Sequence, residues 1–255
     1  MTSLKTAVFT SDNGEDRLLE SRIFDSLKLC RKGHRSSYIG FLNQAQIYKA
    51  DLILKKSGEP YCFWGGYEDA DRKILCIGVS SPDDVPVSTI EFRFRECDKL
   101  GHRDFLGSFM SLGIERDTIG DILIEDGYAV VFVRESVADY ICGQVFKIGR
   151  VGVKPCLAKP DHLPKSEDTA NKTLIVSSLR ADAVISAFTG LSRERVKQLI
   201  KKELAFINYS PCKSISSSLK EGDVVSVRKY GKFIFEEVLG VTGKGRLKIS
   251  VKYFS

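Results

Sequence analysis

The sequence predicts an α+β protein, and three observations carry that prediction. Apolar residues recur at three- to four-residue intervals in much of the first 54 residues, which is the spacing of an amphipathic helix. Between residues 74 and 157, strand-like apolar or alternating runs take turns with helical spacing. A polar segment follows, and beyond it two short helical patterns precede several strand-like runs. Helices and strands in this mixed order favour the α+β class.

The composition is that of a folded chain with two or three domains. Of its 255 residues, 43% are hydrophobic and 28% are charged, which argues against wholesale disorder. No run approaches 18 apolar residues, and the first twenty residues contain no apolar core of a signal peptide. We therefore expect a cytoplasmic protein without a membrane partner, or a stromal one if the source is a plant plastid.

Cysteine and histidine usage excludes two further classes of protein. The seven cysteines are odd in number, widely scattered and without a Cys-x-x-Cys pair, so neither a disulfide framework nor a zinc knuckle is indicated. His34, His102 and His162 have no histidine or cysteine partner at metal-ligand spacing. We expect reduced core cysteines, no metal site and no cofactor.

Residues 1–73 are predicted to form a small helical unit. Segments 16–29 and 41–54 each place apolar side chains on one helix face, as Leu19 and Ile23 do. A Lys-Lys-Ser-Gly sequence is expected to end the second helix.

Residues 74–158 are predicted to alternate strands and helices in a recognisable order. The expected elements are a leading strand at 74–79, a strand at 88–95, a helix at 105–114, strands at 119–124 and 129–133, a helix at 137–146 and a strand at 151–157. After the leading strand, this β-α-β-β-α-β order is the ferredoxin-like arrangement. RNA-recognition motifs (RRMs) share it with many domains that touch no nucleic acid, so the RRM-like order alone assigns no function.

Residues 159–171 are predicted to be a linker, because they contain two prolines, many polar residues and no apolar periodicity. The net charge of +6 divides unevenly around this linker. Residues 172–255 hold 16 Lys+Arg and 7 Asp+Glu, a net +9, whereas residues 1–171 have a net −3. Such local basicity indicates a surface for a polyanion, and nucleic acid is the commonest soluble one.

Residues 172–255 are predicted to form a compact unit of two helices followed by strands. The helices are expected at 180–188 and 193–203, and the strands at 205–207, 224–228, 233–238 and 247–253. Gly190 should end the first helix, and Ser192 should cap the second. Glu194 then lies in the first turn, where the helix dipole favours an acid.

The second of these helices carries the main candidate binding site. Arg193, Lys197 and Lys201 are four residues apart, so each drifts only about 40° from the last and the three form one cationic row. Phosphate oxygens are the groups that such a row would neutralise, and the alternative is a solvated helix face. The candidate RNA-binding residues are Arg180, Ser192, Arg193, Lys197, Lys201, Lys202, Lys213, Arg228 and Lys229.

The order of motifs in this unit is more specific than its charge. The motifs are Arg180-x-Asp182, Leu191-Ser-Arg-x-x-x-Lys-x-Leu-Ile200, Phe206-Ile-Asn208 and Lys220-Glu-Gly-Asp-Val-Val-x-Val-Arg228. Over residues 174–236 this order resembles the alpha-L RNA-binding domain, which is named for a small-subunit ribosomal protein and recurs in pseudouridine synthases and tyrosyl-tRNA synthetases. One position departs from the pattern, because Tyr209 follows Asn208 where the family commonly has glycine.

Motifs upstream extend the resemblance to most of the chain. They are Gly65-Gly-Tyr-Glu68, Gly101-His-Arg-Asp-Phe-Leu-Gly107, Leu112-Gly-Ile114, Gly120-Asp-Ile122 and Lys147-Ile-Gly-Arg150. Together they resemble the YlmH family. The resemblance implies a helical N-terminal part, an RRM-like middle domain, a C-terminal alpha-L domain and no catalysis. It also implies binding to the large ribosomal subunit, with its rRNA and peptidyl-tRNA as partners, in quality control of stalled complexes. We expect a monomer.

The triplet His102-Arg103-Asp104 also occurs in the catalytic loop of protein kinases. No glycine-rich phosphate loop, metal-binding Asp-Phe-Gly or correctly spaced asparagine accompanies it here. We expect Asp104 to interact with backbone amides at a helix start. His102 and Arg103 are then either simply exposed or additional RNA contacts.

Two other functions remain as alternatives from the sequence. One is an RNA-modifying enzyme of the pseudouridine synthase kind, although the middle unit is short for such a catalytic domain and Asp104 and Asp121 lack the surrounding motif. The other is a protein-interaction adaptor, linked for instance to cell division, in which the acidic part of the chain binds a protein.

Overall fold

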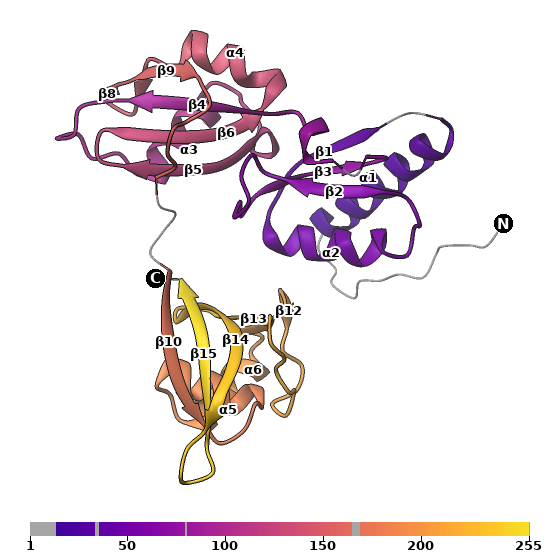
Figure 1. The fold of residues 1–255 in the computed structure, drawn as a ribbon, viewed down its shortest axis with the longest axis vertical. Helices are drawn as coiled ribbons and strands as arrows, with labels where there is room; N and C mark the ends of the chain where they lie inside the picture. Colours follow the sequence, from indigo (N-terminus) through magenta and orange to yellow (C-terminus); the bar gives the residue numbers. More distant parts are fainter. Residues whose placement is uncertain (1–13, 34–35, 80, 165–168, 255) are drawn as a thin grey trace. The chain divides into compact units, whose positions relative to one another are not determined.

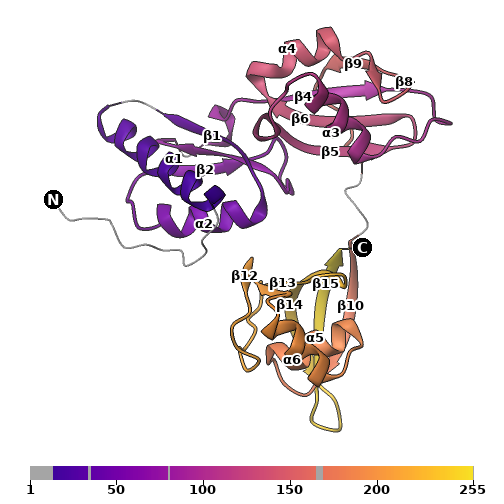
Figure 2. The same cartoon turned by 180° about the vertical axis from the view of Figure 1, so that it is seen from behind.

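The protein folds as two compact units (Figures 1 and 2). Unit 1 comprises residues 1–165 and unit 2 residues 166–255. The computed structural model describes residues 14–33, 36–79, 81–164 and 169–254. The expectations about the first thirteen residues, His34 and residues 165–168 of the linker lie outside this part. No helix among the described residues is long and apolar enough to cross a membrane.

Unit 1 begins with two helices on a small antiparallel sheet. Its elements are α1 (Gly14–Arg31), β1 (Ser37–Leu42), α2 (Gln44–Leu54), β2 (Tyr61–Trp64) and β3 (Lys73–Ile77). The sheet has the order β1-β3-β2, and Ile23 of α1 packs with Leu54 of α2 and Leu75 of β3.

The two predicted helices are present as α1 and α2, but the unit also contains a three-stranded sheet that the prediction of a helical unit missed. Only Asn43, which caps α2 through its side chain, separates the end of β1 from that helix. The apolar residues at the end of β1 therefore fit the helical spacing of α2, and the sequence pattern did not distinguish the strand from the helix. β3 was expected to lead the middle domain, but it is the central strand of this first sheet.

The second half of unit 1 has the β-α-β-β-α-β order that the sequence predicts. The elements are the short helix η1 (Pro82–Asp84), β4 (Val87–Arg93), α3 (His102–Ser111), the short helix η2 (Arg116–Thr118), β5 (Ile119–Glu125), β6 (Tyr128–Arg134), α4 (Glu135–Gln144), β7 (Lys147–Ile148), β8 (Val151–Gly152) and β9 (Lys154–Leu157). The antiparallel sheet has the order β5-β6-β4-β9. The expected last strand is interrupted, because its first two residues form β8, which pairs with β7 and not with the four-stranded sheet.

Each face of this four-stranded sheet packs against other elements of unit 1. On one face Phe92 packs against α3, with its ring centroid 5.4 Å from that of Phe105, as the alternating pattern of β4 predicts. On the other face Val130 and Phe132 of β6 pack with Phe41 and Ile74 of the first sheet. The two sheets of unit 1 therefore share one core.

A buried carboxylate joins the two sheets. Asp121 on β5 accepts hydrogen bonds from the Tyr67 hydroxyl at 2.8 Å and from the backbone N–H groups of Asp71 at 2.6 Å and Arg72 at 3.1 Å. The Arg72 guanidinium donates to the Phe41 carbonyl at 2.7 Å and the Ile119 carbonyl at 3.1 Å. Burial lowers the pKa of Arg72 to about 10, so it stays charged at neutral pH.

Glycine allows the backbone to approach closely at this joint. A Cβ atom on Gly66 would lie 2.3 Å from the Phe132 ring, and one on Gly120 would lie 2.6 Å from the Phe41 ring. Two of the glycine-containing motifs noted in the sequence therefore have a packing explanation.

Unit 2 is a six-stranded antiparallel sheet with two helices packed on it. Its elements are β10 (Thr169–Val176), α5 (Ala181–Thr189), α6 (Arg193–Lys201), β11 (Ala205–Ile207), β12 (Ser210–Pro211), β13 (Val224–Val227), β14 (Gly231–Val241) and β15 (Leu247–Phe254). The sheet order is β10-β15-β14-β13-β11-β12. Val184 of α5 and Val196 of α6 pack with Phe233 and Phe235 of β14 in the core.

The boundary between the linker and unit 2 needs correction. Residues 169–171, expected in the linker, belong to β10, which pairs with β15 along its whole length. The sequence did not predict β10 because its first half is polar. As an edge strand, it buries only Leu174 and Val176 among its described side chains.

The buried carboxylate leads to a prediction about stability. The variant Tyr67→Phe keeps the ring stacked on Phe132 but removes the hydroxyl donor to Asp121. We expect the free energy of unfolding of unit 1 to fall by about 1–3 kcal/mol, because a buried carboxylate loses a hydrogen bond. Urea denaturation followed by circular dichroism measures it. Tyr140→Phe, at a side chain 48% exposed, is the control and should change stability by less than about 0.5 kcal/mol. Equal stability of both variants would contradict the prediction.

Candidate nucleic-acid interface

Two caps position α6, the helix that carries the predicted cationic row. They lie on either side of the short connection between α5 and α6. Gly190 ends α5 in the left-handed conformation, with φ +72°. The Ser192 side chain then accepts a hydrogen bond from the Arg195 N–H at 3.4 Å and caps α6. Both predictions about these residues are confirmed. Val196 and Ile200 anchor α6 in the core, so its opposite side faces solvent.

The α6 cation row consists of Arg193, Lys197 and Lys201, all within one regular helix. Lys197 makes an ion pair with Glu194 at 3.2 Å, and Arg193 donates to the hydroxyl of Ser177. Exposed pairs of this kind contribute at most about 1 kcal/mol, so neither fixes its cation against a phosphate ligand.

The C-terminal end of α6 meets the turn between β13 and β14. The Arg228 N–H donates to the Leu204 carbonyl at 2.9 Å, which places this turn beside the chain that leaves α6. Four exposed cations are thereby gathered from two segments: Lys201, Lys202, Arg228 and Lys229.

Lys213 lies in the loop that follows β12. It follows Cys212, whose N–H donates to the Ala205 carbonyl of β11 at 2.9 Å. Lys213 is exposed and begins the loop that continues to Leu219.

Arg180 lies at the start of α5 and is held by a buried acid. Its Nε donates to the Asp182 carboxylate at 3.0 Å, and Asp182 is only 3% exposed. The Ala181 N–H donates to the Ser217 carbonyl at 2.8 Å, which ties this helix start to the loop after Lys213. The Arg-x-Asp motif is therefore an arginine whose direction is set by a buried carboxylate.

The structure adds one cation that the sequence reasoning missed. Arg246, in the loop between β14 and β15, lines a shallow pocket of about 280 Å³ together with Arg193 and Ser177. Its position could not be inferred from the α6 pattern, because it comes from a hairpin more than fifty residues later in the chain.

The unusual Asn208-Tyr209 pair forms the two-residue connection between β11 and β12. Both residues have positive φ, +47° and +62°, as in a type I′ turn. Asn208 is fixed by its side chain, which donates to Asp223 at 2.8 Å and accepts from the Val224 N–H at 3.0 Å. Tyrosine therefore occupies a backbone conformation that favours glycine.

The remaining candidates, His102 and Arg103, belong to unit 1 and lie exposed in the first turn of α3. Asp104 has the predicted structural role, since its carboxylate accepts the Gly101 N–H at 2.8 Å. Among the residues that the structure describes, no group of three or more His, Cys, Asp or Glu side chains is placed to hold a metal ion.

Fold and interface define a two-unit α+β protein in which a ferredoxin-like domain precedes a small basic unit. Residues 83–159 match the family described as "Putative RNA-binding domain in YlmH". The chain is 26% identical over 245 residues to the ribosome-associated protein quality control protein P2 of Bacillus subtilis, covering 92% of this chain and 94% of the relative. The cell division protein ylmH from Streptococcus pneumoniae has a similar fold, with a TM-score of 0.52 and 17% identity over 60% of this chain and 96% of that one. The chain is therefore similar to YlmH proteins, through a matching domain at residues 83–159 and a relative that aligns over most of its length.

The strained turn leads to a second prediction. The variant Tyr209→Gly should raise the free energy of unfolding of unit 2 by up to about 1 kcal/mol, because glycine adopts a positive φ without steric cost. Thermal and urea unfolding measure the change. Ser210→Gly, one residue later in β12, is the matched control and should lower stability instead. A loss of stability in both variants would show that the tyrosine side chain outweighs the backbone strain.

Proposed function

We propose that this protein is a non-catalytic RNA-binding protein that binds structured rRNA and tRNA on the large ribosomal subunit, in quality control of stalled peptidyl-tRNA complexes. The observation that carries the proposal is the α6 cation row, set on a helix anchored by Val196 and Ile200. The name of the Bacillus subtilis relative and the description of the matching domain support it.

In this proposal unit 2 acts as an alpha-L domain. Arg193, Lys197 and Lys201 neutralise successive phosphates, and Lys202 extends the row toward the turn at Arg228. Arg180, held by Asp182, fixes the orientation of the RNA backbone. Such contacts position a nucleic acid without reading its sequence, so RNA shape and the other unit select the target.

A binding role suits the two aspartates considered for catalysis. Asp104 caps α3 through the Gly101 N–H, and Asp121 accepts three hydrogen bonds within the core of unit 1. Each carboxylate already has a structural partner in the fold. We therefore assign the protein no reaction of its own.

The proposal predicts loss of ribosome binding after charge reversal on α6. The double variant Arg193→Glu/Lys197→Glu replaces attraction to phosphates by repulsion, and we expect its co-sedimentation with large subunits to fall at least tenfold. Sucrose-gradient fractionation of cell lysates, followed by immunoblotting, measures the bound fraction.

A matched control separates a local contact from the general charge of the unit. Lys172→Glu/Lys252→Glu makes the same change in net charge on β10 and β15, at the end of this strand pair opposite the Arg246 loop, and should retain most of the binding. Undiminished co-sedimentation of the α6 variant would overturn the proposal. Co-sedimentation that survives nuclease digestion of the RNA would favour the protein-adaptor alternative.

The salt dependence of binding provides an independent prediction. With Arg193, Lys197, Lys201 and Lys202 on phosphates, the logarithm of the affinity should fall by about 3 per logarithmic unit of salt, at about 0.7–0.9 for each contact. Lys201→Ala should reduce this slope by one such step, whereas Lys172→Ala on the edge strand β10 should not change it. Fluorescence anisotropy with a labelled rRNA hairpin measures the slope, and a flat response would contradict the electrostatic mechanism.

A further inference from the structure

The sheet surface on which RNA-recognition motifs stack bases is closed in this protein. In those motifs, aromatic side chains on the sheet face away from the helices stack on bases. Here that face carries Val130 and Phe132, which pack against Phe41 and Ile74 of the first sheet. If unit 1 contacts RNA, the contact must come from another surface.

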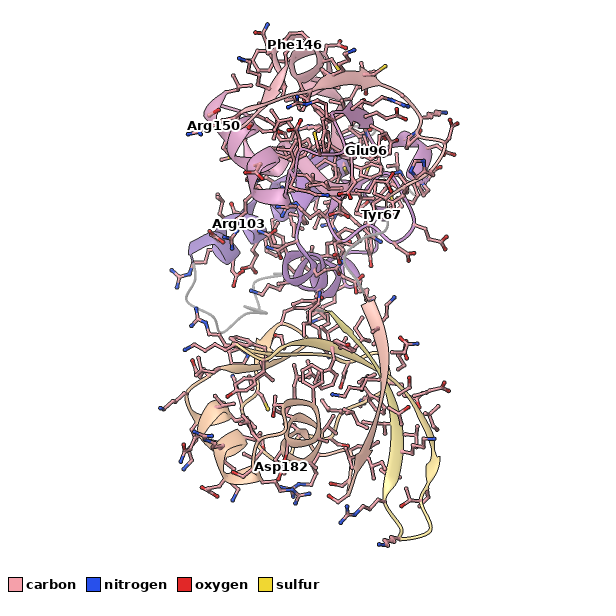
Figure 3. All side chains as sticks on the ribbon, turned by 90° about the vertical axis from the view of Figure 1, so that its left-hand side faces the viewer. Tyr67, Glu96, Arg103, Phe146, Arg150 and Asp182 are labelled. Atoms are coloured by element: carbon pink, nitrogen blue, oxygen red, sulfur yellow. The ribbon has the colours of Figure 1, made fainter. Side chains whose placement is uncertain are left out.

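The uncovered end of the same sheet face is unsuitable for phosphates. A pocket there is lined by five carboxylates, those of Glu91, Glu96, Glu125, Asp126 and Asp161 (Glu96 is labelled in Figure 3). Arg93 and His162 also line the pocket, and each already contacts a carboxylate, Arg93 that of Glu91 and His162 that of Glu125. This pocket would repel an RNA backbone.

By contrast, an open groove on the helix side of the domain has cationic side chains in its lining. It has a volume of about 630 Å³ and lies between α3 and the segment that links α4 to β7. Arg103, Ser108, Phe146 and Lys147 are among its lining residues, and Figure 3 labels Arg103, Phe146 and Arg150 on unit 1. Its size is that of a pocket for a small organic group.

The groove is held in shape by a hydroxyl between its two walls. Ser108 Oγ donates to the Asp104 carbonyl of α3 at 2.8 Å and accepts from the Gly149 N–H of the β7–β8 turn at 3.1 Å. The wall that bears Phe146 is also fixed from below, because its neighbours Val145 and Ile148 are buried in the core. The exposed groups are therefore presented by a rigid backbone.

Phe146 is exposed in a way that the packing of unit 1 does not explain. Its side chain is 58% exposed, although both Val145 before it and Ile148 after it are buried. Gly107, which also lines the groove, occupies an interior position of α3, where glycine costs about 0.5–1 kcal/mol relative to alanine. A Cβ atom there would meet nothing within 4 Å, so packing within the described chain does not require this glycine.

Three cations lie in or next to this groove, because Arg103 and Lys147 line it and Arg150 follows the lining residue Gly149. Arg103, Lys147 and Arg150 are all exposed, and none forms an ion pair with another described residue. An aromatic face flanked by unpaired cations is the combination that single-stranded nucleic acids bind, since bases stack on the ring while the cations neutralise the adjoining phosphates.

We propose that this groove binds an unpaired RNA base, which stacks on Phe146 while Arg103, Lys147 and Arg150 contact the flanking phosphates. The inference rests on the proposed function, because it assumes that the protein works on RNA. It adds a second contact on unit 1, of a different chemistry from the phosphate grip of α6.

The test uses the full chain carrying Arg193→Glu/Lys197→Glu, so that binding by unit 2 is suppressed. Its probe is a fluorescein-labelled single-stranded RNA of twelve uridines, titrated by anisotropy. Adding Phe146→Ala should weaken binding about tenfold or more, because stacking contributes about 1–3 kcal/mol per base and 1.4 kcal/mol is a factor of ten. Phe146→Tyr, which keeps an aromatic face, should bind within about twofold of its parent.

Tyr140→Ala is the matched control, since Tyr140 is an exposed aromatic residue on α4 that does not line the groove. It should bind the probe as its parent does, and thermal unfolding should show that all variants remain folded. Ultraviolet cross-linking of the probe to the parent chain should modify residues 144–150.

Three results would overturn the proposal that this groove binds RNA. They are absence of probe binding by the parent chain, equal affinity of the Phe146→Ala variant, and cross-links confined to unit 2. None of them bears on the α6 cation row, which is tested separately by co-sedimentation with large subunits. Loss of that co-sedimentation together with retained stacking at Phe146 would support both proposals.

Discussion

The buried carboxylate of Asp121 is the interaction on which the architecture of unit 1 depends. Burial raises the pKa of this carboxyl, whereas the hydrogen bonds from Tyr67, Asp71 and Arg72 act to lower it. Removal of an isolated carboxylate from water is expensive, and those three donors offset the cost only when the two sheets are in register. The nearby Arg72 guanidinium adds the same requirement, since the carbonyls that it meets come from both sheets. A hydrophobic contact would tolerate sliding, but this network does not.

This constraint determines which surfaces remain for function. A ferredoxin-like domain has one sheet face covered by its own helices, and in RNA-recognition motifs the other face binds RNA. Here Phe132 lies under the first sheet and stacks on Tyr67 with ring centroids 4.8 Å apart. The arrangement therefore uses the customary binding face as a core, and leaves helix starts and connecting turns as the exposed recognition elements.

Features governed by local chemistry could be predicted from the sequence, and features governed by tertiary pairing could not. Gly190, Ser192 and the α6 cation row follow from capping and helical period, and the structure contains both caps and the helix. The β1-β3-β2 sheet was missed, because β1 runs into α2 through one residue and its partner strand lies more than thirty residues later. The groove at Phe146 and the position of Arg246 depend on contacts between segments that are distant in the sequence. The periodicity of apolar residues gives no information about such contacts.

The two proposed contacts differ in the distance over which they attract RNA. Residues 172–255 carry a net +9, so counterion release can draw this part of the chain to any RNA backbone. Residues 1–171 have a net −3 and an acidic pocket beside Tyr128, so long-range attraction to RNA is weak there. With a Debye length of about 8 Å at physiological salt, the cations around Phe146 act only once a base is already near. Unit 2 would then supply affinity for many RNA shapes, and unit 1 would reject every shape that does not offer an unpaired base within reach.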